Sequence, residues 1–367
     1  MKAAVLHEAG TPLVIEDVPV PQCGPSEILI KVKACGVCHT DLHLAAGEWR
    51  LHKLPLILGH EAVGVVERMG ADVANFKVGD RAGIPWIYST CGECEYCTSD
   101  REALCPQIRV TGFMVDGGYA EYVAVPASHA VAVPEGLSFV DAAPVYCAGL
   151  TPYRALKISG ARVGDTVAIW GVGGLGHYAV QIARAMGARI VAVDVRPSKL
   201  DLARQLGADI ALDASRDDAV KAIRALGGAH VVINLAPTPT AVAQAAEALR
   251  RGGTLVLVGL PPGSFTLPIL QTVAKGIRIL TSAVGTRQDL REVLALAAAG
   301  RIKTVAQTCQ LEEINWAFEQ VGQGSVTGRL VVEFSLAARG RSRPTEHVAA
   351  DVGPEFLKNV NGDAQPE

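Results

Sequence analysis

The sequence lacks an excess of positive charge and long apolar runs, and its first residues do not predict a secretory signal; each of these features argues against a class of protein. Lysine and arginine number 34 against 37 aspartates and glutamates, so the net charge is −3 and no nucleic-acid partner is expected. No apolar run approaches the roughly 18 residues of a membrane-spanning helix, so no membrane partner is expected. The chain starts with Met-Lys-Ala-Ala-Val-Leu-His-Glu, which has too few apolar residues for a secretory signal, and we therefore expect a cytoplasmic protein.

The composition indicates a well-packed globular protein with more than one domain. Apolar residues make up 49% of the chain and charged residues 19%. A length of 367 residues exceeds what one ordinary hydrophobic core holds, so two domains are expected. Nine cysteines are present. Because cytoplasmic thiols stay reduced, these cysteines indicate metal binding or catalysis rather than disulfides.

The pattern of apolar residues changes near residue 151. Before this point short strand-like segments dominate, such as residues 28–33, which alternate with a period of two. After it, short buried strands and helical segments alternate over residues 167–170, 189–194, 218–226, 231–235, 241–249, 254–259 and 277–283. This alternation predicts an α/β fold with a parallel, doubly wound sheet. A helix is expected over residues 287–299, and the polar tail from residue 339 is predicted to lie outside the core.

A glycine turn follows the predicted strand 167–170 and opens a helix, which is the context of a dinucleotide-binding turn. Gly171, Gly173 and Gly176 have the spacing G-x-G-x-x-G. They let the backbone approach a pyrophosphate, while the helix N-terminus supplies free N–H groups. Asp194 ends the next strand, where a carboxylate binds the adenosine ribose and repels a 2′-phosphate, so NAD is favoured over NADP. Arg196 could weaken that preference, and a turn that binds nothing is the alternative.

Four cysteines cluster between residues 91 and 105. Cys91, Cys94 and Cys97 have the spacing C-x2-C-x2-C, and Cys105 follows eight positions later. Four thiolates with short spacings are typical of a closed, tetrahedral structural zinc site. An iron–sulfur cluster, which also uses four thiolates, and four unconnected free cysteines are the alternatives.

Three further residues are candidates for a catalytic metal site. Cys38, in Cys-Gly-Val-Cys-His-Thr-Asp-Leu-His, and His60, in Gly-His-Glu, carry the ligand types that zinc prefers, and Cys147 is the best candidate for a third ligand. Catalytic zinc needs only three protein ligands and keeps its fourth position open. The three residues lie far apart in the sequence, so spacing alone leaves ordinary packing as the alternative.

Together, and in this order, these motifs resemble those of zinc-dependent alcohol dehydrogenases of the medium-chain dehydrogenase/reductase family, over roughly residues 1–335. The resemblance implies a mostly-β GroES-like catalytic domain of residues 1–150, completed by residues 286–338, and a Rossmann NAD-binding domain of residues 151–285. Residues 339–367 remain as a polar tail. The resemblance also implies two zinc ions per subunit, one catalytic and one structural, and a homodimer or homotetramer.

The resemblance assigns the metal sites residue by residue. It implies that Cys38, His60 and Cys147 bind the catalytic zinc and that Glu61 lies behind the metal and ligates it transiently. Asp41 resembles the carboxylate that orients His60 and thereby fixes which ring nitrogen faces the metal. The implied ligands of the structural zinc are Cys91, Cys94, Cys97 and Cys105.

The remaining roles concern the proton, the coenzyme and the substrate. Thr40 resembles the hydroxyl that touches the alcohol, and His43 resembles the outer end of a proton relay. The residues that resemble coenzyme contacts are His39, Gly171, Gly173, Gly174, Leu175, Gly176, Asp194, Lys199 and Arg329. Trp49 and Trp86 occupy the positions of pocket-lining tryptophans in small-alcohol members, with ordinary core packing as the alternative.

The resemblance therefore predicts an oxidoreductase that transfers a hydride reversibly from a small primary alcohol to NAD, giving an aldehyde. Zinc can lower the pKa of bound water from about 16 to about 7, and an alcohol should be acidified by the same electrostatics. Two alternatives stay open: the same chemistry on an aromatic alcohol or a polyol, and a non-catalytic NAD-binding protein that keeps zinc only for structure. Tyr146 is bulkier than the aliphatic residue expected beside Cys147, which leaves the pocket shape open. No role is assigned to Cys23, Cys35 and Cys309.

Overall fold

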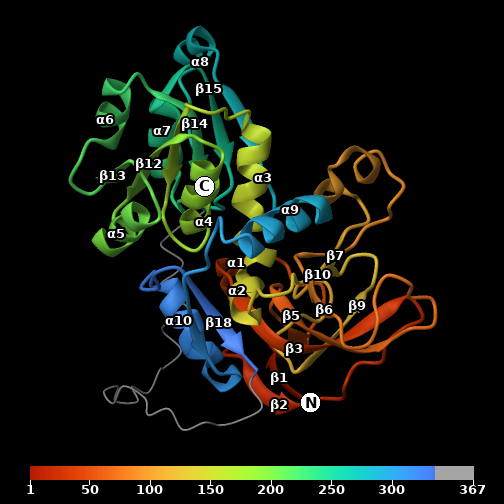
Figure 1. The fold of residues 1–367 in the computed structure, drawn as a ribbon. Coiled ribbons are helices and arrows are strands. Elements are labelled where there is room, and N and C mark those ends of the chain that lie inside the picture. The colour runs from red at the N-terminus through yellow and green to blue at the C-terminus, as the bar shows by residue number, and fades with distance from the viewer. Residues whose placement is uncertain (335–367) are drawn as a thin grey trace.

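The computed structural model describes residues 1–334, so the predicted tail of residues 339–367 lies outside the described residues. Two sheet-containing domains lie one above the other in Figure 1, the lower one built mainly from the red and orange N-terminal strands and the upper one from the green strands. The chain enters the upper domain through α3 (Leu150–Ser159) and returns at α9 (Arg287–Ala298). Within residues 1–334, no helix combines the length and apolar character needed to span a bilayer.

The upper domain is a six-stranded parallel sheet with helices packed against it, as the alternating pattern predicted. The strand order is β13-β12-β11-β14-β15-β16. The strands are β11 (Thr166–Trp170), β12 (Arg189–Asp194), β13 (Ile210–Asp213), β14 (Ala229–Asn234), β15 (Leu249–Leu257) and β16 (Arg278–Thr281). The helices are α4 (Gly176–Ala185), α5 (Pro197–Gln205), α6 (Ala219–Ala225), α7 (Pro239–Glu247) and α8 (Ile269–Lys275). The order reverses between β11 and β14, so the glycine turn after β11 lies where doubly wound sheets bind their ligands.

Helix α4 is buried on every side over its first two turns, polar residues included. The sheet covers one face, and residues 303–305 cover another. The amide of Gln181 donates to the carbonyl of Lys303 at 2.9 Å, and the hydroxyls of Tyr178 and Thr304 are 2.5 Å apart. These bonds satisfy polar groups that burial would otherwise leave unpaired, and they attach the helix that follows the glycine turn to the returning chain.

Strands from residues 27–132 and from residues 306–333 together build the main sheet of the lower domain. Its strand order is β10-β6-β5-β3-β18-β17, with β9 also paired to β3. The last strand, β18, pairs antiparallel with β3, so Val332 lies opposite Cys35. The strands of this sheet are β3 (Glu27–Val37), β5 (Ala62–Met69), β6 (Arg81–Ile84), β9 (Tyr122–Pro126), β10 (Val131–Ala132), β17 (Ala306–Cys309) and β18 (Arg329–Glu333). This arrangement is the GroES-like domain that the resemblance implied, whereas the exact domain boundaries stay predictions.

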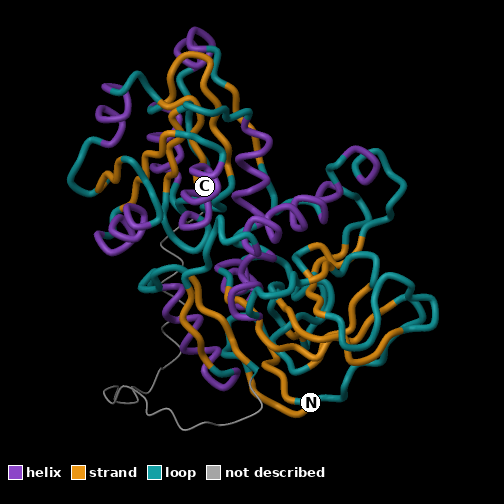
Figure 2. The backbone as a smooth tube through the Cα atoms, viewed as in Figure 1, coloured by secondary structure: helices purple, strands orange, loops and turns teal. Residues whose placement is uncertain are grey.

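Smaller elements surround this sheet. Two further small sheets are made by β1 (Lys2–Leu6), β2 (Val14–Asp17) and β4 (Leu56–Ile57), and by β7 (Ile87–Ser89) and β8 (Arg109–Val110). The helices are α1 (His39–Ala45), α2 (Phe139–Ala142) and α10 (Ile314–Gly322), with 3-10 turns at Cys97–Ser99, Glu102–Leu104, Ala143–Tyr146 and Leu311–Glu313. Figure 2 shows that helices gather in the upper domain and between the domains, whereas strands and loops dominate below.

One hydrophobic core runs from one domain into the other. Val145, Tyr146 and Val331 of the lower domain share a buried cluster with Val167 and Ile169 of β11. Burial of apolar surface stabilises by roughly 25 cal/mol per Å², so this shared cluster holds the two domains against each other. The candidate site lies beside it, because Cys147 directly follows Tyr146.

Candidate metal and coenzyme site

Four potential ligands converge from three parts of the lower domain. Cys38 lies between β3 and α1, His60 and Glu61 lie between β4 and β5, and Cys147 follows the 3-10 turn at Ala143–Tyr146. Their ligand atoms all lie within 4.8 Å of one another, and all four residues are buried. The Sγ atoms of Cys38 and Cys147 are 4.0 Å apart, and two tetrahedral Zn–S bonds of about 2.3 Å separate their sulfurs by roughly 3.8 Å. The donor set therefore fits zinc.

The electrostatics of this cluster favour a thiolate at Cys38. A hydrogen bond from Cys147 and the nearby charge of His60 hold the pKa of the Cys38 thiol well below its ordinary value, although burial opposes this. Burial disfavours the charged form of His60, but the adjacent Asp41 and Cys38 raise its pKa well above the usual value. A thiolate is the form of cysteine that binds metals, and His60 must release the proton on Nε2 when a cation binds.

Asp41 lies against two of the candidate ligands, His60 and Cys38. Its carboxylate is fully buried and lies 3.0 Å from Nδ1 of His60, and it accepts the backbone N–H of Cys38 at 3.0 Å. Because an ionised carboxylate only accepts hydrogen bonds, Nδ1 carries the hydrogen and Nε2 is left to bind a metal. Tyr119 donates a third hydrogen bond to Asp41, at 2.7 Å. Sequence reasoning missed Tyr119, which carries no ligand chemistry of its own.

The glycine before His60 makes room for that tyrosine. Gly59 has φ = +93°, and a Cβ atom placed on it would lie 2.8 Å from the ring of Tyr119. In the same way, a Cβ atom on Gly36 would meet a carboxylate oxygen of Glu61 at 1.8 Å. The glycines of the two ligand motifs are therefore required by the packing around the site.

Glu61 and Arg329 form a buried pair behind the ligands. One oxygen of Glu61 accepts from the guanidinium of Arg329, and the other is buried without a partner among the described residues. Burial raises the pKa of Glu61 to about 7, although the charge of Arg329 acts in the opposite direction. Arg329 also lies against the glycine turn, since a Cβ atom on Gly174 would meet its Cδ at 2.7 Å. Arg329 thus connects the metal-ligand cluster with the predicted coenzyme site.

Helix α1 carries the residues predicted to handle the proton. Thr40 and His43 are three residues apart, so they lie on one face of this helix. The Nδ1 atom of His43 is 2.6 Å from Glu48, and the side chain is 18% exposed. The ring of His39 lies 5.2 Å from that of His43. His43 therefore has access to solvent and an acidic partner that fixes its ring.

Aromatic side chains gather beside His60. The rings of Trp86 and His60 are 4.9 Å apart, and Trp49 meets Trp86 edge to face at 6.4 Å. Phe113 stacks on Trp86 at 6.2 Å. The sequence pattern did not single out Phe113, because no local signal distinguishes it from a core aromatic. Tyr146 is fully buried and donates its hydroxyl to the carbonyl of Val131, so it belongs to the core.

The glycine turn has the geometry that a diphosphate needs. Gly171 has φ = +95°, and a Cβ atom on Gly176 would lie 2.1 Å from the carbonyl oxygen of Gly171, so both positions require glycine. A Cβ atom on Gly173 would meet nothing within 4 Å, which leaves open space above the turn. Leu175 precedes the first residue of α4. The residues present therefore fit a dinucleotide.

Asp194 lies beside this turn at the end of β12. One of its oxygens accepts the N–H of Val172 at 2.7 Å, and the other accepts the N–H groups of residues 195 and 196. A carboxylate has about four acceptor positions, so capacity remains for ribose hydroxyls. Lys199 lies close enough for the charge of Asp194 to favour its protonation, although burial lowers its pKa overall. Arg196 instead donates to the carbonyl of Gln323 at 2.7 Å.

The four remaining candidate ligands form a separate lobe. The Sγ atom of Cys91 is 3.8 Å from that of Cys97 and 3.6 Å from that of Cys105, and Cys94 is 3.5 Å from Cys97. These separations match the roughly 3.8 Å expected around one tetrahedral zinc ion and leave no room for several iron atoms. The other cysteines pack elsewhere: Cys35 and Cys309 are buried, and Cys23 donates to the carbonyl of Glu27.

Comparisons with known proteins agree with this geometry. The family model "Alcohol dehydrogenase GroES-like domain" matches residues 24–135, and "Zinc-binding dehydrogenase" matches residues 174–299. An alcohol dehydrogenase of Geobacillus stearothermophilus is 50% identical over 335 residues, which cover 91% of this chain and 99% of the relative. One from Moraxella sp. (strain TAE123) is 46% identical and covers 92% and 100% of the two chains.

Solved structures give the same result. The crystal structure of the alcohol dehydrogenase from the hyperthermophilic archaeon Aeropyrum pernix matches with a TM-score of 0.85 and 36% identity, and the match covers 91% of this chain and 100% of that one. At this identity and coverage the likeness extends through both domains. The chain therefore belongs to the zinc-dependent alcohol dehydrogenases of the medium-chain dehydrogenase/reductase family.

Proposed function

We propose that the protein is an NAD-dependent alcohol dehydrogenase that oxidises small primary alcohols reversibly to aldehydes, with one catalytic and one structural zinc ion per chain. One observation carries the proposal: the ligand atoms of Cys38, His60 and Cys147 converge within 4.8 Å, and Arg329 connects this cluster to the glycine turn. A substrate at the metal ligands and a dinucleotide at the turn would therefore meet. The cytoplasmic location stays a prediction.

The chain's own residues then have distinct tasks. When bound, zinc supplies Lewis-acid chemistry and NAD supplies the hydride acceptor. Cys38, His60 and Cys147 would hold the metal, and Asp41 keeps His60 in the binding tautomer. The hydroxyl of Thr40 accepts the substrate's proton while donating its own, and His43 on the same helix face delivers the proton to solvent.

A substrate panel tests this proposal directly. With NAD and ethanol we expect NADH formation at 340 nm that exceeds the rates with benzyl alcohol and sorbitol. A ranking led by benzyl alcohol or by sorbitol would favour the aromatic or the polyol alternative. Absence of NADH formation with every alcohol, in protein that carries zinc, would favour a non-catalytic NAD-binding protein.

The coenzyme preference should depend on Asp194. We expect the unmutated enzyme to prefer NAD over NADP, because the carboxylate repels a 2′-phosphate. Asp194→Gly should lower the ratio of kcat/KM with NAD to kcat/KM with NADP by about tenfold or more, since a charged hydrogen bond contributes roughly 1.5–3 kcal/mol. Asp209→Gly in the same domain is the matched control and should leave the ratio unchanged. Equal kcat/KM values for NAD and NADP in the parent would contradict the assignment.

The aromatic cluster should set the size of the substrate. Trp49→Ala and Trp86→Ala remove ring volume near His60. The activity on branched alcohols relative to ethanol should therefore rise by about tenfold or more, because a methylene-sized change in a pocket already has an effect of about tenfold. Phe113→Ala should act in the same direction. Trp316→Ala, at a 43% exposed tryptophan outside this cluster, serves as the control. If all variants keep the parent's ranking of alcohols, these rings do not line the pocket.

A homo-oligomer is the remaining part of the proposal, and the edge of the parallel sheet supports it. β16 is the last strand of that sheet, and the neighbouring helix α8 exposes Ile269, Leu270 and Val273 by 82%, 81% and 73%. A second copy turned about a two-fold axis would pair its β16 with this edge and cover the apolar side chains of both helices. Light scattering should give a mass of two or four chains. Leu270→Glu should reduce this mass, whereas Val163→Glu, at an equally exposed apolar side chain, should leave it unchanged.

A further inference from the structure

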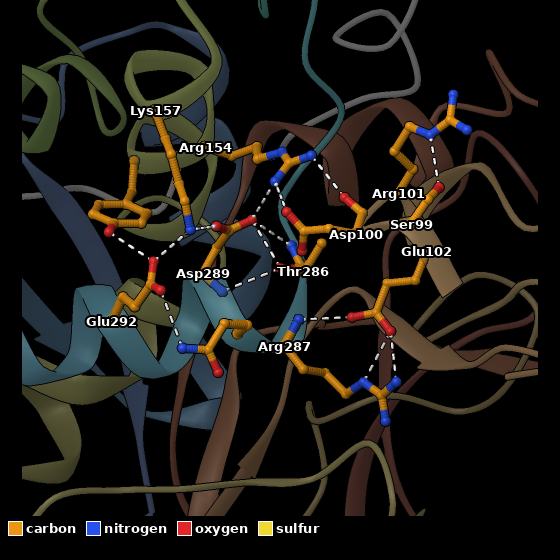
Figure 3. A network of polar contacts seen from close by, with 12 residues as sticks. Ser99, Asp100, Arg101, Glu102, Arg154, Lys157, Thr286, Arg287, Asp289 and Glu292 are labelled. Carbon is orange, nitrogen blue, oxygen red and sulfur yellow. Dashed lines mark hydrogen bonds and ion pairs between the residues drawn. The ribbon is translucent and has the colours of Figure 1, made fainter. Parts of the chain in front are cut away.

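A network of charged side chains joins the four-cysteine lobe to both places where the chain passes between the domains (Figure 3). The first crossing, residues 147–150, leads from the candidate ligand Cys147 into α3, and the N–H of Thr151 donates to the carbonyl of Cys147 at 2.9 Å. The second crossing, residues 282–286, leads from β16 into α9. The two crossings touch, because a Cβ atom on Gly285 would lie 2.5 Å from Leu150.

Glu102 connects the lobe to the second crossing. It lies in the 3-10 turn just before Cys105, and its side chain is 6% exposed. One carboxylate oxygen accepts the backbone N–H of Arg287, the first residue of α9, at 2.7 Å. The other accepts the guanidinium of Arg287 through Nε at 2.9 Å and Nη2 at 2.7 Å. The carboxylate thus lies at the N-terminus of α9, where the helix dipole favours a negative charge, and its bonds to the guanidinium are charge-assisted.

Asp100 connects the same lobe to the first crossing. Its carboxylate and its backbone carbonyl both accept from Arg154 of α3 at 2.8 Å. Arg154 also reaches Asp289 of α9 at 3.2 Å, and Lys157 donates to the same carboxylate at 2.8 Å. Asp289 is fully buried and caps α9 through Thr286. The lobe, α3 and α9 are therefore held together at one place, as the sticks in Figure 3 show.

The second crossing contains a residue in an unfavourable backbone conformation. Val284 has φ = +49°, in the left-handed region that β-branched side chains rarely adopt. Such a residue persists only where its surroundings hold it. Here the capping of α9 by Asp289 and the anchoring of Arg287 by Glu102 begin within three residues of it. The network therefore stabilises a crossing that the local sequence disfavours.

We propose that Glu102 and Asp100 are positioning residues, through which the four-cysteine lobe sets the relative orientation of the two domains. The proposal rests on the proposed function, because the domains carry the two halves of the reaction: metal ligands on one and the coenzyme turn on the other. Hydride transfer needs reacting atoms about 3–3.5 Å apart, and a displacement of about 1 Å can cost about 100-fold in rate. The lobe thus acts on catalysis at a distance from the candidate active site.

The test compares Glu102→Gln, which keeps the shape and removes the charge, with Glu93→Gln, an exposed lobe residue whose carboxylate makes no hydrogen bond or ion pair within residues 1–334. Both variants should retain the parent's zinc content. In the coenzyme-free protein, Glu102→Gln should speed amide hydrogen exchange in residues 147–159 and 282–298 by about threefold or more, whereas Glu93→Gln should not. The kcat of the Glu102→Gln variant should fall about tenfold, and its deuterium isotope effect on kcat should rise as hydride transfer becomes rate-limiting.

Two outcomes overturn the proposal: faster exchange confined to residues 91–105, or a lower melting temperature with unchanged kcat and isotope effect. If Glu102→Gln does not fold, Asp100→Asn, at a half-exposed side chain, is judged by the same criteria. Failure of the proposed function can be distinguished from failure of this inference about the lobe. A parent enzyme that oxidises no alcohol with NAD refutes that function, while the exchange comparison, made without coenzyme, still decides whether the lobe holds the crossings.

Discussion

A Cys38→Ser enzyme is expected to lose one zinc ion per chain and at least about 1,000-fold in kcat/KM while it stays folded. Zinc contributes several kcal/mol of transition-state stabilisation, and each 1.4 kcal/mol is a factor of ten in rate. Cys38 directly follows β3, and the ladder of β3 to β5 and β18 does not include it, so the sheet should persist. Cys35→Ser is the matched control: it changes a buried thiol of β3 that lies outside the ligand cluster, and this variant should retain both zinc ions.

Loss of a cysteine in the four-cysteine lobe should mainly affect stability, in contrast to the loss of Cys38. Cys94→Ser should remove the other zinc ion and lower the free energy of unfolding by several kcal/mol, since structural zinc can contribute roughly 10 kcal/mol in small zinc domains. Metal analysis, denaturant unfolding and steady-state kinetics of both variants separate the two sites. A single zinc ion in a fully active parent enzyme would contradict the assignment of two sites with unequal roles.

Thr40→Ala is expected to nearly abolish hydride transfer across the whole pH range. The hydroxyl is the group on α1 that can accept the substrate's proton and donate its own at once, which alanine cannot do. The loss should appear in the pre-steady-state formation of NADH, where later steps do not mask it. Thr40→Ser keeps the hydroxyl and serves as the control. A Thr40→Ala enzyme with a near-normal transient would rule the relay out.

His43→Gln should fail differently, because His43 lies at the solvent end of the same helix face. The variant should be slower near neutral pH and should recover as pH rises, since hydroxide then replaces the missing base. Glu48, at 2.6 Å from the ring, orients His43 in the structure, and Glu48→Gln should therefore have a smaller effect in the same direction. A His43→Gln profile parallel to that of the parent would remove His43 from the relay and leave the rest of the proposal standing.

The fold and the ligand types could be predicted from the sequence because their signals are local. The alternation of short strands and helices after residue 151 predicted the parallel sheet, which the structure has. The close spacing of Cys91, Cys94 and Cys97 predicted one metal lobe, and these sulfurs lie together. The glycine turn was identifiable because it stands between a strand and a helix. In each case residues a few positions apart carry the whole signal.

Cys38, His60 and Cys147 lie too far apart in the sequence for spacing to assemble them, so their grouping was expected from the resemblance to a family. The structure places their ligand atoms together, whereas their roles as ligands stay predictions until metal is measured. The same holds for Thr40 and His43, whose helix the structure supplies and whose part in a proton path it leaves to experiment.

The sequence by itself determined the local features: four closely spaced cysteines, a glycine turn between a strand and a helix, and the strand and helix periods around them. Only the tertiary structure decided what surrounds these groups. Tyr119 reaches Asp41 across 78 residues, Arg287 reaches Glu102 across 185, and Arg329 reaches Glu61 across 268. Such partners leave no local trace, because a buried charge needs an opposite charge or a donor from any part of the chain that packing brings within reach.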